Sequence, residues 1–271
     1  MVIGKVDFVA RNHTYIMGIL NVTPDSFYDG GNYTTVDKAL FRAEEMIKEG
    51  ADIIDIGGES TRPGYEEISV EEEIKRVEPV IKKIKSEFNI PISLDTYNPE
   101  TAKAGIQAGA DLINDIWGLQ FDPEMANVIR DGNVACCLMH NRKEHDYEDF
   151  KTDFYKDIEA ILRKAADAGI GRDKIILDPG VGFQKTTEEN RWVLKDLAGL
   201  NKYELPVLVG ASRKSVVGNT LNLPKEERLE GTLAITAISV MAGARFVRVH
   251  DIKENKRVIS MMEAIRNEEI D

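Results

Sequence analysis

The stretch PISLDTYNPETAKAGIQAGADLINDIWG (91–118) contains one complete strand–helix–strand unit. Its apolar run 92–94 predicts a buried strand. Asn98 then places a cap residue before Pro99, which is typical of the first turn of a helix. Gly109 ends that helix, and a second short apolar run follows it. Apolar runs without alternation, joined through an amphipathic helix, predict parallel strands covered on both faces.

The same unit recurs along the whole chain. The predicted strands cover residues 15–20, 52–56, 92–94, 112–113, 134–139, 175–177, 207–209 and 246–249. The predicted helices cover residues 35–49, 69–88, 98–109, 122–132, 151–168, 187–198, 226–242 and 253–267. Pro79 lies inside the second of these helices, so we expect a kink there or two shorter helices.

Eight such units fit either an open doubly wound sheet or a closed (β/α)8 TIM barrel of the α/β class. The first predicted strand is followed by NVTP (21–24) instead of the G-x-G-x-x-G fingerprint of the open fold, so we predict the barrel. The opening VDFVARNHTYIM (6–17) predicts an N-terminal β-hairpin whose first strand covers the barrel bottom. Because no linker or shift in composition interrupts the chain, we predict a single domain, 1–271.

Composition excludes several classes of function. Lys and Arg number 35 and Asp and Glu 47, and the net charge of −12 without a basic tract argues against binding to nucleic acid or to an anionic membrane surface. The N-terminus has no signal-peptide pattern and no apolar stretch is long enough to span a membrane, so we expect a cytoplasmic protein. The only cysteines, Cys136 and Cys137, are adjacent and rule out a disulfide framework. In a strand they would point to opposite faces, most simply as two small buried residues.

Every predicted strand is followed by polar or ionisable residues. One such residue is ordinarily a helix cap or a loop contact, but the carboxyl ends of all barrel strands meet at one rim, where TIM barrels carry their active sites. Eight polar strand ends on one rim therefore predict a polar pocket. The cations after the last two strands predict an anionic small substrate, with surface ion pairing as the alternative for Arg213 and Lys214. The residues concerned are Asn21, Glu59, Asp95, Asn114, Asp115, His140, Asp178, Ser212, Arg213, Lys214, Arg248 and His250.

Two loops are longer than barrel turns require. Residues 21–34 and 57–68 are rich in Gly, Pro and polar side chains, and loops of this length are often lids over an active site. Arg62 in the second loop would bring a cation over the pocket. A surface loop without a role is the alternative interpretation.

Eight motifs, each at a strand end and in order along the chain, together resemble the dihydropteroate synthase family. They are NVTPDSF (21–27), GGESTRPG (57–64), LDT (94–96), NDIWG (114–118), LMH (138–140), DPGVGF (178–183), GASRKS (210–215) and RVHD (248–251). Each motif alone is a weak signal, and the eight in register are specific.

The resemblance implies an enzyme of folate biosynthesis, a transferase in which p-aminobenzoate attacks the methylene of 6-hydroxymethyl-7,8-dihydropterin diphosphate. The products would be 7,8-dihydropteroate and pyrophosphate, Mg²⁺ would be required, and the protein would be a homodimer. The implied pterin contacts are Asp95, Asn114, Asp178 and Lys214, with Met139 and Phe183 packed near the ring. The implied diphosphate contacts are Asn21, which would also bind the Mg²⁺, Arg248, which would lie across the pterin face, and His250. The p-aminobenzoate pocket would be framed by Thr61, Arg62, Pro63, Phe183, Lys214 and Ser215, with Asp25 and Phe27 on the first lid.

We expect a dissociative reaction in which diphosphate departs first and Asp95 opposes the charge of the pterin methylene cation, so that Asp95, Lys214 and Arg248 carry catalysis. Two alternatives share the pocket. A pterin-binding methyltransferase barrel would not need the diphosphate cations, and a non-catalytic pterin-binding protein would have lost Asp95, Lys214 or Arg248. Two departures from the family pattern, Tyr28 and Gln184, put lid packing in doubt but not the reaction.

The segment 229–241 is dominated by small apolar residues. Such a helix can bury itself against the sheet or against a second subunit, and the sequence alone leaves both open.

Overall fold

The computed structural model describes residues 1–9, 12–23, 35–59 and 68–268. Its eight parallel strands are β3 (Tyr15–Asn21), β4 (Ile53–Gly57), β5 (Ile92–Asp95), β6 (Leu112–Asp115), β7 (Ala135–Met139), β8 (Ile175–Asp178), β9 (Leu208–Val209) and β10 (Phe246–Val249). They stand in the order β8-β7-β6-β5-β4-β3-β10-β9. A parallel bridge between Leu177 of β8 and Val207, directly before β9, joins the two ends of this order. The predicted barrel is confirmed, and each strand lies on its predicted apolar run.

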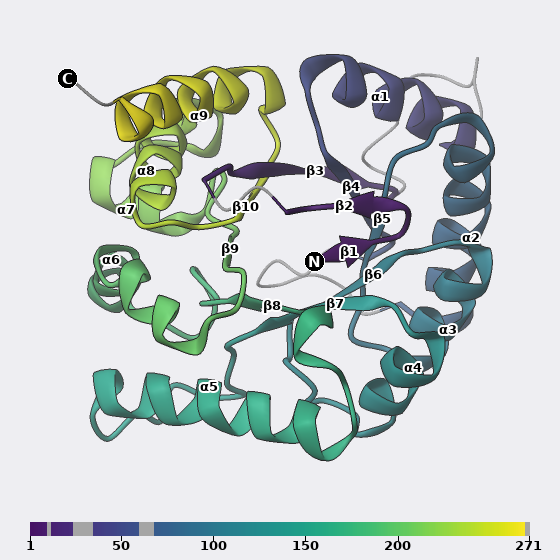
Figure 1. Ribbon diagram of the computed structural model, residues 1–271, viewed down its shortest axis with the longest axis horizontal. Helices are drawn as coiled ribbons and strands as arrows, with labels where there is room; N and C mark the ends of the chain where they lie inside the picture. Colours follow the sequence, from purple (N-terminus) through teal and green to yellow (C-terminus); the bar gives the residue numbers. More distant parts are fainter. Residues whose placement is uncertain (10–11, 24–34, 60–67, 269–271) are drawn as a thin grey trace.

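Helices form a ring around the strands (Figure 1). They are α1 (Thr35–Glu49), α2 (Val70–Glu87), α3 (Pro99–Ala108), α4 (Glu124–Gly132), α5 (Phe150–Asp167), α6 (Thr187–Lys195), α7 (Ser215–Leu221), α8 (Leu229–Met241) and α9 (Ile252–Asn267). Short 3-10 turns occur at Arg172–Lys174, Leu197–Tyr203 and Lys225–Glu227. The sequence did not predict α7, because seven residues are too short to show a helical period. Among the described residues, no helix is long and apolar enough to cross a membrane.

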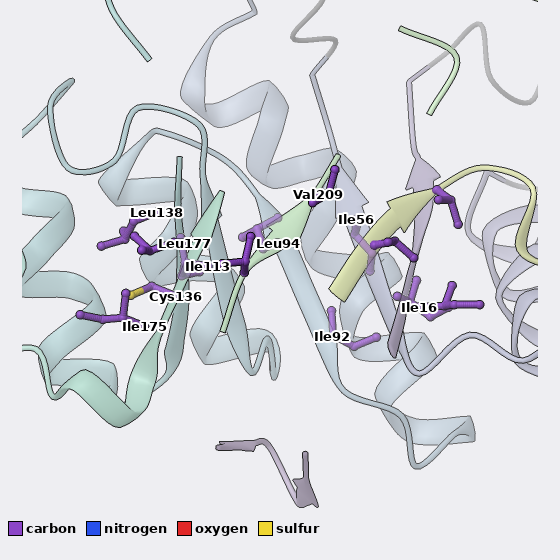
Figure 2. Packing of buried hydrophobic residues seen from close by; sticks show 14 of the residues in the cluster. Ile16, Ile56, Ile92, Leu94, Ile113, Cys136, Leu138, Ile175, Leu177 and Val209 are labelled. Atoms are coloured by element: carbon purple, nitrogen blue, oxygen red, sulfur yellow. The ribbon is translucent and has the colours of Figure 1, made fainter. Parts of the chain in front are cut away.

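Alternate residues of each strand face opposite sides of the barrel wall. One set packs outward against the helices, and Figure 2 shows it as a layer of aliphatic side chains with the Cys136 sulfur among them. The other set faces the barrel axis, and Cys137 belongs to it. The two adjacent cysteines therefore point to opposite faces, as predicted, and both are buried. This two-residue period determines which side chains can reach the site.

The bottom of the barrel is filled by an apolar plug. A hairpin of β1 (Val2–Ile3) and β2 (Val6–Asp7) lies across the barrel in Figure 1, and Ile3 and Phe8 pack against the inward side chains of the strands. The predicted covering hairpin is present, but its expected pairing is wrong. We expected a hairpin within residues 6–17, whose first strand would pair with the strand that begins near Tyr15, whereas Val6–Asp7 pairs back onto Val2–Ile3. The Phe8 and Tyr15 rings instead pack edge to face, with centroids 4.7 Å apart.

The expectation of two shorter helices around Pro79 is wrong, because α2 is one continuous helix with Pro79 inside it. Proline removes a hydrogen bond to the carbonyl four residues earlier, here that of Lys75. Both residues are exposed, so that carbonyl lies on the solvent side of the helix. On the opposite side, Val77 and Ile81 are buried and hold the helix against the barrel.

Candidate active site

The strand register places three predicted site residues in one row across the rim, with Gly57 between two of them. Asn21 pairs with Gly57, Gly57 with Asp95, and Asp95 with Asn114. Asp95 and Asn114 are almost fully buried. Glycine at position 57 leaves space in the middle of the row, since an added Cβ would lie 3.6 Å from the Asp95 Cβ. The adjacency expected from the barrel is therefore present for these side chains.

Arg248 of β10 crosses the barrel interior to two carboxylates. Its Nε donates to Oδ2 of Asp55 and its Nη2 to Oδ2 of Asp95, each at 2.6 Å. Asp55 is fully buried and also accepts the hydroxyl of Ser93. Burial alone would lower the pKa of Arg248, but the two carboxylates raise it, so the guanidinium stays charged. Burial raises the pKa of Asp95 and Arg248 opposes that shift.

A second cation, Lys214, lies near enough to Asp178 for the two charges to attract each other. Burial lowers the pKa of Lys214 to about 8, against the attraction of Asp178. Burial likewise raises the pKa of Asp178, and the charge of Lys214 opposes it. The Lys214 ammonium donates to the carbonyl of Val181 at 2.7 Å and lies 4.5 Å from the centre of the Phe183 ring. Carboxylate, ammonium and aromatic ring thus form one group at the ends of β8 and β9.

The loop between β8 and α6 is held from inside by two side chains that the sequence did not single out. The Lys185 ammonium donates to the carbonyl oxygens of Gly180 at 2.9 Å and Phe183 at 3.0 Å. Asn190 of α6 accepts the backbone N–H of Gly182 and donates back to the Lys185 carbonyl. Burial lowers the pKa of Lys185 to about 7. Both side chains fix the loop that carries Phe183.

An apolar cluster lines the same rim. Met139 at the end of β7 is buried with Tyr97 and Ile116, and Phe183 and Trp117 pack against them. The predicted neighbours Met139 and Phe183 therefore share one cluster. Trp117 packs in it, in keeping with a packing role for that residue.

Several polar strand ends serve the fold instead. Asp115 accepts the backbone N–H groups of Trp117 and Leu119, and burial raises its pKa to about 6. His140 is fully buried, pairs with Asp157 of α5, and has its pKa lowered to about 4 by burial.

Two further strand ends also make structural contacts. Arg213 pairs with Asp251 through its Nε at 2.9 Å, so ion pairing, the alternative given for it above, describes this residue. Glu59 accepts the backbone N–H of Ile68.

Of the predicted ligand contacts not yet located, some lie among the described residues and others do not. His250 Nδ1 lies 3.0 Å from the Ser212 hydroxyl, and Ser215 is the first residue of α7. The predicted lid and arylamine-pocket residues lie outside the described residues, namely Asp25, Phe27, Thr61, Arg62 and Pro63.

Asn21 offers Mg²⁺ a hard oxygen ligand at the rim. No group of three His, Cys, Asp or Glu in the described part of the chain could hold a metal by itself. Mg²⁺ typically keeps several waters and takes one or two protein ligands beside substrate phosphates. The amide oxygen of Asn21 lies on the open side of Gly57, 3.7 Å from where a Cβ would stand. This donor fits an ion shared with a bound diphosphate.

Comparison with known proteins agrees with this geometry. The model of the family described as pterin binding enzyme matches residues 17–250. The chain belongs to the pterin-binding enzyme family. The dihydropteroate synthase of Clostridium beijerinckii is 52% identical to it over 266 residues, which cover 98% of this chain and 99% of the relative.

Solved structures of pterin-binding enzymes share the fold. The dihydropteroate synthase of Clostridium difficile, crystallised in the presence of pteroic acid, matches with a TM-score of 0.91 and 46% identity over 94% of this chain and 98% of that chain. The enzyme of Xanthomonas albilineans with 4-aminobenzoic acid matches with a TM-score of 0.91 and 37% identity, over 96% of this chain and 95% of that chain. The family resemblance is confirmed, and the chain is a transferase of folate biosynthesis.

Proposed function

We propose that this pterin-binding enzyme condenses 6-hydroxymethyl-7,8-dihydropterin diphosphate with p-aminobenzoate, releasing 7,8-dihydropteroate and pyrophosphate. The observation that carries the proposal is the convergence of two carboxylates and two cations on one buried rim. Arg248 donates to Asp95, and Lys214 lies within electrostatic reach of Asp178. Likeness to synthases over nearly the whole chain supports the same reaction.

Asp95, Asn114 and Asp178 supply the pterin recognition. An aminopterin edge presents N–H donors beside acceptors, and carboxylate and amide groups can bind such an edge through paired hydrogen bonds. Oδ1 of Asp95 is buried without a hydrogen-bond partner in the described structure, so it is available to a ligand donor. Met139 and Phe183 would cover the ring on its apolar side.

Arg248, His250 and Asn21 supply the diphosphate site. A leaving diphosphate gains negative charge, and fixed cations in a buried site stabilise that charge strongly. Magnesium held between Asn21 and the diphosphate would neutralise part of the same charge. Arg248 is already oriented by two carboxylates, so little reorganisation is needed when the leaving group develops its charge.

The arylamine would enter beside Phe183, Lys214 and Ser215. An arylamine is uncharged at neutral pH, so its attack needs no strong general base. We propose that diphosphate departs first and that Asp95 opposes the charge of the resulting methylene cation. Thr61, Arg62 and Pro63 would frame the pocket, with Asp25 and Phe27 on the first lid.

The test incubates the purified protein with the pterin diphosphate, p-aminobenzoate and Mg²⁺ and follows both products. Equal amounts of dihydropteroate and pyrophosphate, lost with a chelator and restored by Mg²⁺, are expected. Tight binding of the pterin diphosphate without product would overturn the reaction. Omitting p-aminobenzoate tests the step order. Release of pyrophosphate without the amine is expected, and strict dependence of C–O cleavage on the amine contradicts the dissociative path.

We further propose a homodimer formed through α8 and α9. The buried positions of α8 are Thr232, Thr236, Ser239 and Val240, whereas Ile238 and Met241 on its outer side are about half exposed. Most buried positions of α8 are therefore polar, and most of its exposed positions are apolar. Exposed apolar side chains on the outer face of a helix favour contact with a second protein surface. Leu221 of α7 and Met261 and Ile265 of α9 are likewise exposed apolar residues.

Light scattering after size-exclusion chromatography tests the dimer. Wild-type protein should have twice the chain mass, and Ile238→Asp should give monomers. Phe41→Asp is the matched control, because Phe41 is 63% exposed on α1 and should leave the dimer intact. A monomeric wild type contradicts the proposal. The cytoplasmic location remains a prediction from the sequence.

A further inference from the structure

We propose that Asp55 is a positioning residue that keeps Arg248 in place while Asp95 transfers its hydrogen bonding to the pterin. The inference rests on the proposed function, because it assigns different roles to the two carboxylates that share Arg248. Asp55 does not touch the substrate. It acts through the guanidinium.

The surroundings of Asp55 leave it nothing to bind except its present partners. It is 0% exposed in the interior of β4. Oδ2 accepts Nε of Arg248 at 2.6 Å and Oδ1 accepts the hydroxyl of Ser93 at 2.5 Å. A buried carboxylate is retained only where it is paired and hydrogen-bonded, and both oxygens of Asp55 meet that condition.

Asp95 is arranged differently. Its Oδ2 accepts Nη2 of Arg248 at 2.6 Å, but its Oδ1 is buried without a partner in the described structure. It stands two residues beyond Ser93 on β5, one step closer to the open rim. One oxygen of Asp95 is therefore aimed at a ligand, whereas neither oxygen of Asp55 is.

With two carboxylates beside it, Arg248 keeps one counter-charge when the other carboxylate binds the pterin. If Asp95 turns toward pterin N–H donors, its hold on Arg248 weakens, and a buried guanidinium without a counter-charge is costly. Asp55 remains on Nε and keeps Arg248 charged and oriented. Without the charge of Asp55, Arg248 would have to keep Asp95 as its carboxylate partner and would compete with the pterin for it.

Asp55→Asn tests the role with little change of shape. We expect kcat/KM for the pterin diphosphate to fall by about tenfold to a hundredfold, the range of a hydrogen bond between charged groups. The KM for p-aminobenzoate should not change. Ser93→Ala should give a smaller loss of the same kind. Asp52→Asn is the matched control, because Asp52 precedes β4 and its carboxylate accepts the backbone N–H of Ile16 instead of a side chain of the site. It should leave both KM values unchanged even if it lowers stability.

A double-mutant cycle separates positioning from structural support. If Asp55 acts through Arg248, adding Asp55→Asn to Arg248→Met should cause no further loss of kcat/KM. Equal losses in both backgrounds overturn the proposal, as does wild-type kinetics in Asp55→Asn. If wild-type protein itself makes no dihydropteroate, the proposed function fails. Binding of 6-hydroxymethyl-7,8-dihydropterin by calorimetry then still tests Asp55, with weaker binding expected in Asp55→Asn and unchanged binding contradicting its role.

Discussion

The two ends of the barrel interior are built from the same strands but with opposite chemistry. At the bottom, the inward side chains are apolar and the N-terminal hairpin closes them off. At the top, two residues further along β4, β8 and β10, the inward positions are charged. Phe246 lies in the bottom plug and Arg248 in the site. Ile53 lies in the plug and Asp55 beneath the site.

The difference separates stability from function along each strand. Apolar burial at the bottom gains free energy without needing a particular partner. Charges at the top are costly to bury and are stable only as a set, since each carboxylate depends on a particular cation. We therefore expect substitutions at the bottom to change the free energy of unfolding and substitutions at the top to change substrate binding.

The largest effect on stability is expected for Phe246→Ala. The Phe246 ring is 1% exposed and contacts the rings of Phe8 and Tyr15. Its removal should lower the free energy of unfolding by about 3–5 kcal/mol, with KM unchanged where the protein is folded. Urea unfolding and steady-state kinetics check this. A raised KM would show that the two ends are not independent. Phe41→Ala, at an exposed position, should change stability by about 0.5 kcal/mol or less.

Arg248→Ala, on the same strand, should affect both properties. It leaves Asp55 buried without its cation, which should cost about 3 kcal/mol of stability. Binding of the pterin diphosphate should weaken by about 2 kcal/mol or more, because charge-assisted contacts are lost. Calorimetry and urea unfolding check both numbers. Arg142→Ala, which breaks an ion pair with Asp157 outside the barrel, should leave binding unchanged. Wild-type binding by Arg248→Ala would remove Arg248 from the site.

Much of the difference between the apolar bottom and the polar top of the barrel could be predicted from the sequence. The apolar runs located all eight strands, and the residue after each run located Asp95, Asn114 and Asp178 at the rim. The motifs then identified the family. The charged residue of the barrel interior that the sequence prediction missed lies inside one of the runs. Asp55 lies inside the apolar run 52–56 and was counted as part of it. Because Asp55 is two residues from Ile53 on the same strand, its side chain faces the barrel axis as that of Ile53 does. A charged residue at an inward-facing position of a predicted strand is the signal that could have identified Asp55.

Long-range partners account for the remaining misses. Asp55 and Arg248 are 193 residues apart, and nothing local in either strand indicates that they pair. Arg213 and Lys214 are neighbours in sequence, yet they have different partners. Arg213 pairs with Asp251, whereas Lys214 lies within electrostatic reach of Asp178. The hairpin error has a similar origin, because packing of Phe8 in the barrel bottom, and not local alternation, fixes the N-terminal strands.

A pH profile sharpens the contrast at Lys214. Burial lowers its pKa from 10.5 to about 8, so the ammonium that we propose contacts the pterin loses its proton as pH rises through that value. Binding of 6-hydroxymethyl-7,8-dihydropterin should weaken accordingly between about pH 8 and pH 10. The neutral form is the one that burial favours, so the Lys214 contribution to stability rises over the same window. Binding and stability should therefore change in opposite directions.

Lys214→Arg is the control for that assignment. Arginine stays protonated throughout the range, so the alkaline loss of binding should disappear. Calorimetric titrations of wild type and variant across the range provide the measurement. An alkaline loss that persists in Lys214→Arg would assign it to another group.

The smallest effect concerns two residues with left-handed backbone, one at each end. Gln184 has φ of 42° in the loop that carries Phe183, and Asn133 has φ of 49° at the end of α4, before β7 enters the bottom. Asparagine tolerates this conformation better than glutamine, so Gln184→Gly should stabilise the protein by about 0.5–1 kcal/mol and Asn133→Gly by less.

The kinetics of the two glycine variants distinguish the two ends. Glycine loosens whichever loop receives it. At position 184 this should raise the KM for p-aminobenzoate about twofold to threefold, because the loop positions Phe183; position 133 is remote from the rim and its KM should stay constant. Thermal unfolding and steady-state kinetics on both variants provide the comparison. If Gln184→Gly is stabilised with an unchanged KM, the contacts of Lys185 and Asn190 alone hold the loop, and the backbone strain at position 184 contributes nothing to the site.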